Sequence, residues 1–589
     1  MPRVGAPGEQ VGVRKGIGDV VRSAILWLVE RRLVLATGLA AALPIIASTA
    51  EVVAAGWVPL ADDALIAVSA FDVLTPDSPL LGPWSSGYSA VVDEPTFHPG
   101  PLLFWLLAVP ARLPWPGALE LTVGLVNLAS VMGIVGLAHR RGGRPLMLVV
   151  AIAIPLMLAS LPAEAYSDIW NPSAPLLPFT LLIFLAWSLA CGDYRLLPLT
   201  VLVASFLPQG HLAFLPPALG VLAVGLGGLA LWLRDARCAP PARSDRAGTA
   251  EGASVRLWVM AAILVGVVCW SAPAIDQATN RPGNLQLIYR AVRADQTTVG
   301  WVQGRRAVVR AVGVVPWWLR EPQAPLERIA DLVVAPGPVA KGSAVLMLGA
   351  LAAVTILGWR RRRPDIWAAG ALGLVLCAAL ALVTASAPEN SAPTLGYTLR
   401  WGSPAGMWVW LALGWSLATL LRPARHRETV RRPPLAFAGL LVVAVVAAVV
   451  AVSGELMQDP YAEMRTIADR LEAELPPQQA VRIDVASSPD TVFTAWGFQS
   501  GIVYALRRDG RRVTVPAVAD YLGPEYGPGS GGYEQIVRVY VDTPPPPGDR
   551  VVARLTVTES ADPAGAPFAP KTPPKRALAV TLMPVRADR

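Results

Sequence analysis

The sequence of 589 residues is poor in charged residues and in cysteine. Only 16% of its residues are Asp, Glu, Lys or Arg, 54% are hydrophobic, and there are 4 cysteines. All four cysteines lie in apolar stretches or in a basic loop, which predicts neither a disulfide framework nor a thiolate metal site. The sequence also lacks a phosphate-binding P-loop and a dinucleotide-binding glycine fingerprint, which argues against an ATP-driven pump and a nucleotide-sugar enzyme.

Apolar runs rich in Ala, Val, Leu and Gly are what the sequence does contain. A helix needs roughly 20 such residues to cross a hydrocarbon layer about 30 Å thick. We therefore predict a polytopic α-helical membrane protein with about 11 spans. The predicted spans are 33–49, 119–138, 145–162, 174–191, 195–208, 212–233, 255–273, 342–358, 366–387, 404–421 and 436–454.

The net charge of +8 is concentrated in segments between the apolar runs. Such clusters are typical of cytoplasmic loops, so they indicate topology rather than nucleic-acid binding. The N-terminal segment 1–32 is basic and predicted cytoplasmic, whereas 51–111 contains no Lys or Arg and is predicted to be external. The remaining basic segments are 139–141, 234–246, 360–363 and 422–432.

These basic segments alternate consistently only if the short run 99–109 does not cross the membrane. Its length predicts a re-entrant or interfacial helix. The resulting topology places residues 455–589 outside a plasma-membrane domain of residues 33–454, which has external loops at 50–98 and 276–341.

The external C-terminal segment 455–589 is predicted to be a small α/β domain with an accessory role in acceptor binding or partner contact. Helical periodicity and alternating patterns define its elements. Helices are predicted at 459–475 and 491–508, strands at 481–485, 513–518, 536–541 and 551–557, and loops or disorder at the Pro-rich stretches 544–547 and 563–574.

Asp62 and Asp63 follow the first span directly. Desolvation beside the membrane raises the pKa of a carboxyl and makes it a better base. Because two adjacent carboxylates in a dry site repel one another, one of them is expected to hold a proton or a divalent cation. The structural alternative is that Asp62 caps a helix and Asp63 lies in its solvated first turn.

External segment 276–341 is rich in arginine. Its guanidinium groups suit a departing phosphate, or alternatively lipid head groups beneath an amphipathic helix. The arginines are Arg281, Arg290, Arg293, Arg305, Arg306, Arg310, Arg320 and Arg328, and the aromatic and apolar residues are Trp301, Val308, Val312, Trp317 and Trp318.

Three further residues each have a functional and a structural interpretation. His98 is either a donor to phosphate or to an Asp, or an ordinary loop residue. His211 is a functional candidate because it lies between two spans, or a packing residue at the helix ends. Arg400, beside Trp401, either binds phosphate or reaches toward the membrane interface.

The order of several short motifs resembles that of the GT-C superfamily, polytopic glycosyltransferases that use polyprenyl-phosphate-linked sugars. The resemblance covers roughly residues 30–420, and the later motifs resemble an actinobacterial-type, uncharacterised branch. In that superfamily the acidic residue after the first span is the catalytic base, which implies Asp62 or Asp63 here. The motifs are Asp62-Asp63, Phe97-His98-Pro99-Gly100-Pro101, Trp170-Asn171-Pro172, Gln209-Gly210-His211-Leu212, Trp270-Ser271-Ala272-Pro273, Asp276-Gln277 and Pro282-Gly283-Asn284.

The sequence therefore predicts transfer of a sugar from a polyprenyl-phosphate donor to an envelope glycan, lipid or protein acceptor on the outer face. Asp63 is preferred as the base, and Asn at Asp72 or Asp77 is expected to have little effect. The candidate substrate-binding residues are Glu94, His98, Trp170, Asn171, Gln209, His211, Asp276, Gln277, Asn284 and Arg400. A non-catalytic protein that binds a glycan or a partner is one alternative. A lipid-intermediate transporter is the other, although the spans contain few of the charged residues that transport needs.

Overall fold

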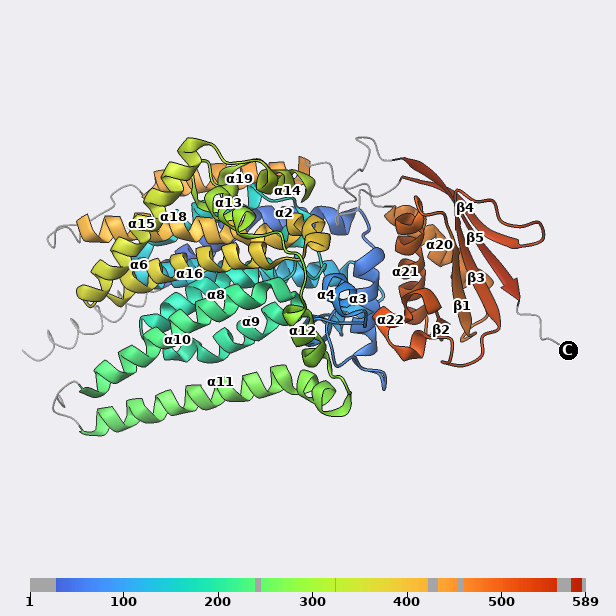
Figure 1. Ribbon diagram of the computed structural model, residues 1–589, viewed down its shortest axis with the longest axis horizontal. Coiled ribbons are helices and arrows are strands. Elements are labelled where there is room, and N and C mark those ends of the chain that lie inside the picture. Colours follow the sequence, from blue (N-terminus) through green and yellow to red (C-terminus); the bar gives the residue numbers. More distant parts are fainter. Residues whose placement is uncertain are drawn as a thin grey trace, which may run out of the picture.

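The computed structural model describes residues 28–238, 245–323, 325–421, 433–453, 460–558 and 574–584. The basic segment 422–432 and almost all of 1–32 and 563–574 lie outside these ranges. Figure 1 shows a bundle of long helices with a domain of helices and strands at one end. The longer helices are α2 (Leu43–Ala54), α6 (Ala118–Ala159), α8 (Leu176–Ala190), α9 (Leu197–Gly210), α10 (Leu215–Cys238), α11 (Asp245–Thr279), α15 (Pro338–Arg360), α16 (Pro364–Ser386), α18 (Gly402–Leu421) and α19 (Pro433–Ser453).

Six helices in the described ranges are long and apolar enough to cross a membrane, or seven if the bent pair Leu28–Ala41 and Leu43–Ala54 is one span. The chain is thus a multi-pass membrane protein, but the predicted count of 11 is not confirmed. Helices α8 and α9 have 15 and 14 residues. At 1.5 Å per residue they reach only about 22 Å, less than the hydrocarbon thickness.

Helix α6 contains two of the predicted spans, 119–138 and 145–162. It has 42 residues, about twice the length of a single crossing. The helix is broken at Gly143, whose φ of 64° and ψ of −160° are not helical. Glycine suits this position because it adopts positive φ without steric cost. At the break, Arg140 lies 2.5 Å from the Asp193 carboxylate.

Shorter helices connect the long ones. They are α3 (Ala61–Asp72), α4 (Ser86–Val92), α5 (Leu102–Leu107), α7 (Glu164–Ser167), α12 (Asn284–Arg293), α13 (Trp301–Val312), α14 (Pro325–Val333) and α17 (Leu395–Thr398). The run 99–109, predicted not to cross, contains α5. This helix has six residues and is about 9 Å long, and it packs against α3 and α9.

The arginine-rich segment packs into the bundle, because α13 lies against α16 and α18. Val308, Val312 and Trp317 of the predicted amphipathic face are buried. Gly406 permits this close approach, since a Cβ there would lie 2.1 Å from the Ala311 carbonyl oxygen. Protein thus covers these three residues, whereas Trp301 of the same predicted face is 61% exposed.

A five-stranded sheet with the order β2-β1-β3-β5-β4 forms the C-terminal domain. Strands β1, β2 and β3 are parallel, and β5 is antiparallel to both β3 and β4. Figure 1 shows α20 and α21 on the side of the sheet that faces the bundle. The elements are α20 (Tyr461–Glu474), β1 (Val481–Ala486), α21 (Val492–Arg508), β2 (Val513–Thr514), α22 (Ala519–Leu522), β3 (Gln535–Val541), β4 (Arg550–Thr558) and β5 (Lys575–Pro584).

Strand β5 was not predicted from the sequence, although it joins β3 to β4. It directly follows the Pro-rich stretch 563–574, which was predicted to be loop or disorder, and no strand was predicted after that stretch. Strand β2 is also shorter than the predicted 513–518, because Pro516 begins a 3-10 helix and proline cannot donate a ladder hydrogen bond. A fragment of the domain that ends before β5 would therefore lack one of the sheet's inner strands.

The C-terminal domain and the first loop (residues 50–98) share one hydrophobic core, in which α21 packs along α3. Figure 1 shows α3 between the bundle and α21. Asp72, at the end of α3, is buried, and its carboxylate lies 2.5 Å from both the Arg507 guanidinium and the Tyr526 hydroxyl. Asp72 is thus unsuited to the inert role predicted for it, whereas Asp77 is exposed.

Candidate active site

The predicted acidic pair lies in the first turn of α3. The N-cap residue is Leu60, and no side chain caps the helix. The capping role considered for Asp62 is therefore wrong. The free N–H groups at a helix start favour an ionised carboxylate nearby. Ala61 has a φ of 47°, a left-handed conformation that costs a residue with a Cβ about 1–2 kcal/mol, and such local strain is often found at functional sites.

Two further carboxyl groups, which the sequence motifs did not reveal, lie beside Asp63. Glu120 is in the first turn of α6, and Asp168 follows α7. The Asp168 carboxyl is within hydrogen-bonding reach of both Asp63 and Glu120. Glu120 is only 1% exposed. An acidic residue at the start of an apolar run was the available signal for Glu120.

The carboxyl cluster (Asp63, Glu120 and Asp168) brings three acidic side chains into contact. Burial raises the pKa of the Asp63 carboxyl well above its usual range, and the charges of Asp168 and Glu120 raise it further. Ionised carboxylates only accept hydrogen bonds, so two of them in contact need a shared proton. The cluster can therefore take up and release a proton close to Asp62.

Asp62 is held by an aromatic residue from another part of the chain. Trp170 Nε1 donates to Asp62 Oδ2 at 3.0 Å, and the Trp170 backbone N–H donates to Asp168 Oδ1 at 3.1 Å. The Arg400 guanidinium lies 5.9 Å from the centroid of the Trp170 ring. Arg400 is buried and donates to Glu164 at 2.7 Å. The fold thus brings three predicted residues together, but the charge of Arg400 is balanced by Glu164.

His98 and His211 contact each other, with ring centroids 4.9 Å apart. Their Nδ1 atoms accept hydrogen bonds from the backbone N–H groups of Leu212 and Ala213, at 3.2 and 3.3 Å. Burial lowers the pKa of His98 well below its usual range, with a contribution from His211, and lowers the pKa of His211 to about 4. Both rings are therefore neutral near pH 7, and neither supplies positive charge to a phosphate.

Gln209 and Asn171 bind backbone groups. Gln209 accepts from the Leu102 N–H at 3.3 Å and donates to the Cys269 carbonyl at 2.8 Å. Asn171 donates to the Gly210 carbonyl at 3.2 Å. These amides fasten the loops around the histidine pair, and direct substrate binding by them stays a prediction.

Asp276 of α11 and Asn284 of α12 hold the loop that contains Phe97 and His98. Asn284 exchanges two hydrogen bonds of 2.9 Å with the backbone of Phe97. Asp276 Oδ2 accepts from the Asn284 backbone N–H at 2.8 Å. Gln277 is partly buried, and its Oε1 has no hydrogen-bond partner within the described ranges. A substrate-binding role for these residues also stays a prediction.

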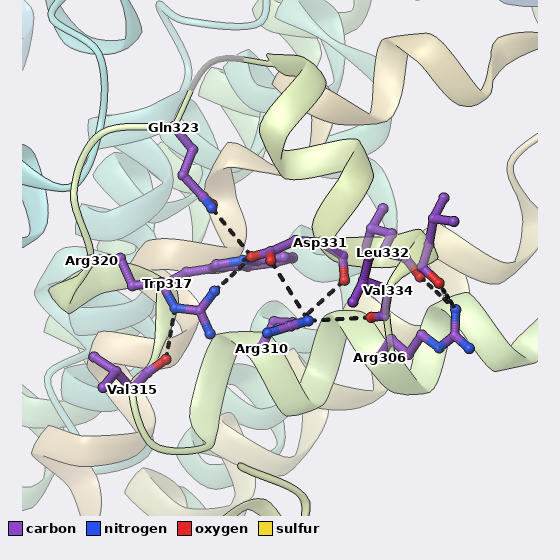
Figure 2. A network of polar contacts seen from close by, with 10 residues as sticks. Arg306, Arg310, Val315, Trp317, Arg320, Gln323, Asp331, Leu332 and Val334 are labelled. Atoms are coloured by element: carbon purple, nitrogen blue, oxygen red, sulfur yellow. Dashed lines mark hydrogen bonds and ion pairs between the residues drawn. The ribbon is translucent and has the colours of Figure 1, made fainter. Parts of the chain in front are cut away.

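Four of the eight arginines in segment 276–341 make contacts within the protein that stabilise the fold. Figure 2 shows Arg306, Arg310 and Arg320 around Asp331 and neighbouring carbonyl groups. Arg320 donates to Asp331 at 2.6 Å, and Arg306 donates to the Leu332 carbonyl at 3.0 Å. Arg328 is buried, with its guanidinium 4.9 Å from the centroid of the Trp317 ring. These four arginines are engaged within the protein itself.

The other four arginines, Arg281, Arg290, Arg293 and Arg305, are exposed. Helix α12, which carries Arg290 and Arg293, packs against α4 of the first loop (residues 50–98). There Arg290 lies 3.6 Å from Glu94, both being exposed. Exposed ion pairs of this kind are weak, so Arg290 can exchange Glu94 for an anionic ligand.

A divalent cation at Asp62 and Asp63 was one sequence-based expectation. Across the described ranges, no group of three or more His, Cys, Asp or Glu side chains is placed to hold a metal ion. Asp62 instead accepts the Trp170 N–H, and Asp63 faces other carboxyl groups.

No protein-family model matches the sequence, and no curated protein matches it. Among solved structures, the chain is similar to ArnT from Cupriavidus metallidurans in the apo state, with 13% identity and a TM-score of 0.42, covering 95% of this chain and 98% of that one. It is also similar to the same protein bound to undecaprenyl phosphate, with 13% identity and a TM-score of 0.46, covering 94% of this chain and 98% of that one. Similarity at this level does not establish a function.

Proposed function

We propose that this protein is a GT-C-type membrane glycosyltransferase that transfers a sugar from a polyprenyl-phosphate donor to an acceptor of the cell envelope. The observation that carries the proposal is the Asp62 carboxylate, which Trp170 holds at 3.0 Å beside the proton-sharing carboxyl cluster. Helix α3, which carries Asp62 and Asp63, lies at the end of the bundle nearest the C-terminal domain (Figure 1). A donor anchored in the membrane by its lipid presents its scissile bond at such an interface.

Asp62 acts as the general base in this proposal, in place of the Asp63 preferred from sequence. The hydrogen bond from Trp170 favours the ionised form and fixes its direction. Asp62 takes the proton of the acceptor hydroxyl as the acceptor oxygen bonds to the anomeric carbon. The bond from that carbon to the phosphate oxygen breaks, and polyprenyl phosphate leaves with the electron pair.

Asp63 shares protons with Asp168 and Glu120 and provides a place for the proton after transfer. Arg290 and Arg293 of α12 are the proposed contacts for the donor phosphate, because they are exposed beside the first loop. Arg400 positions Trp170 rather than binding phosphate, since Glu164 already pairs with it. The N-terminal segment is proposed to be cytoplasmic and the C-terminal domain extracytoplasmic.

The test is transfer of labelled sugar from a polyprenyl-phosphate donor in membranes that carry each variant. Asp62→Asn keeps the size of the side chain but cannot accept a proton, so the rate should fall about a hundred- to ten-thousand-fold. Asp77→Asn, at an exposed position of the same loop, should retain wild-type turnover. Wild-type turnover in the Asp62→Asn, Asp63→Asn double variant would refute the proposed base.

A further inference from the structure

Two aromatic rings meet where the C-terminal domain reaches the first external loop. Tyr521 belongs to α22, which packs against α3. Its ring centroid lies 4.3 Å from that of Trp84, and the two ring planes are inclined by 44°. Both side chains are only partly buried. The pair thus joins residues from two separate parts of the chain and keeps some surface open to solvent.

Trp84 is firmly placed by the backbone around it. Trp84 forms an isolated antiparallel β-bridge with Phe97, and the Ser85 N–H donates to the Thr96 carbonyl at 2.8 Å. At the adjacent pair of residues, the His98 N–H donates to the Pro83 carbonyl at 2.9 Å. The tryptophan therefore lies on a short, ordered hairpin of the first loop.

Tyr521 is equally constrained, because its domain is docked by several contacts. The Tyr504 hydroxyl donates to the Ala111 carbonyl at 3.1 Å, and Arg508 donates to the Pro114 carbonyl at 2.8 Å. The Asp72–Arg507 ion pair adds a third attachment. The two aromatic rings are therefore held in contact before any ligand binds.

Tyr521 lies against the helix that carries Asp62, because α22 packs on α3 and Asp62 is in the first turn of α3. Burial raises the pKa of the Tyr521 hydroxyl, and the charges of Asp520 and Asp62 raise it further. The aromatic pair thus packs against the helix that carries the carboxylate to which the proposed function assigns the acceptor proton. A group bound on these rings would place its hydroxyls next to that carboxylate.

We propose that Trp84 and Tyr521 form a binding platform for a sugar ring of the acceptor, so that the C-terminal domain completes the active site. The C–H face of a pyranose or furanose is apolar and packs on aromatic rings, while its hydroxyls point outward to polar groups. Tryptophan and tyrosine suit this role because each combines a large apolar surface with a polar edge. The identity of the ligand as an acceptor rests on the proposed function.

The experiment measures saccharide binding without any donor. Full-length protein in lipid nanodiscs is labelled and applied to an array printed with pentose, hexose and hexosamine oligosaccharides. Wild-type protein should bind a subset of these, and Tyr521→Ala should weaken that binding about tenfold. Tyr521→Phe, which keeps the ring, should bind as wild type does.

The matched control is Tyr533→Ala. Tyr533 is a partly buried tyrosine of the same domain whose ring contacts Arg482 instead of the first loop. Its loss should leave saccharide binding unchanged. No bound saccharide with wild-type protein, or equal binding by Tyr521→Ala, would overturn the inference. Saccharide binding without any sugar transfer would instead count against the proposed function alone.

Discussion

Asp72 and Arg507, 435 residues apart in the sequence, form an ion pair with 2.5 Å between Oδ1 and Nη2, in which Asp72 is buried and Arg507 is partly buried. Tyr526 donates to the second oxygen of the same carboxylate. A single side chain at the end of α3 thereby receives two donors from the C-terminal domain. The first loop and the C-terminal domain are attached to each other at the side of the candidate active site.

Asp72→Asn should destabilise the protein by about 3 kcal/mol, because it leaves the Arg507 charge partly buried without its counter-ion. The measurement is the unfolding temperature of the purified protein in detergent. Asp77→Asn is the control, since this residue is exposed and surface changes usually remain within about 0.5 kcal/mol. Equal unfolding temperatures for the two variants would show that the ion pair does not hold the domains together.

Trp170→Phe should slow sugar transfer about tenfold, because it keeps an aromatic ring but removes the N–H that holds Asp62. The rate at saturating donor and acceptor is the quantity to compare. Trp401→Phe is the matched control: Trp401 is also buried, and its Nε1 has no hydrogen-bond partner in the described ranges. An equal loss of rate in both variants would indicate a general packing effect.

Asp63→Asn should gain stability relative to wild type as the pH rises. The raised pKa of folded Asp63 means that the unfolded chain releases this proton at a lower pH than the folded chain does. Above the ordinary pKa of an aspartate, near 4, wild-type stability therefore falls with pH until the folded pKa is passed. The slope is at most about 1.4 kcal/mol per pH unit.

Unfolding temperatures of wild type and Asp63→Asn from pH 4 to pH 8 test this dependence. Their difference should grow with pH, and the Asp77→Asn variant, changed at an exposed position, is measured as the control. A constant difference for Asp63→Asn would mean that its carboxyl titrates normally in the folded protein.

Labelling of introduced cysteines tests the proposed topology. Gly529 is exposed, and a Cβ there would meet nothing within 4 Å. Gly529→Cys should react with an impermeant maleimide in intact cells. Arg361→Cys, in the exposed basic segment 360–363, should react only after permeabilisation. The reverse pattern would place the carboxylates on the cytoplasmic side and would exclude the proposed reaction at the outer face.

Local patterns in the sequence determined the class of the protein and the character of its parts. The lengths of apolar runs indicated a multi-pass membrane protein, and periodicity located α20, α21 and β1 to within a few residues. The adjacent Asp62 and Asp63 were visible because they are neighbours in the chain. Such features depend on stretches of about 5 to 20 residues, over which hydrophobic length and side-chain period are physically constrained.

Only the tertiary structure decided which distant groups meet. Glu120 and Asp168 join Asp63, and Trp170 holds Asp62, through contacts between separate helices. Four of the arginines that looked available for a phosphate are engaged within the protein, and Asp72 is an attachment point rather than an inert residue. A charged side chain reads the same in the sequence whether solvent, a carbonyl or a counter-ion surrounds it, because its partner is selected by packing between elements far apart in the chain.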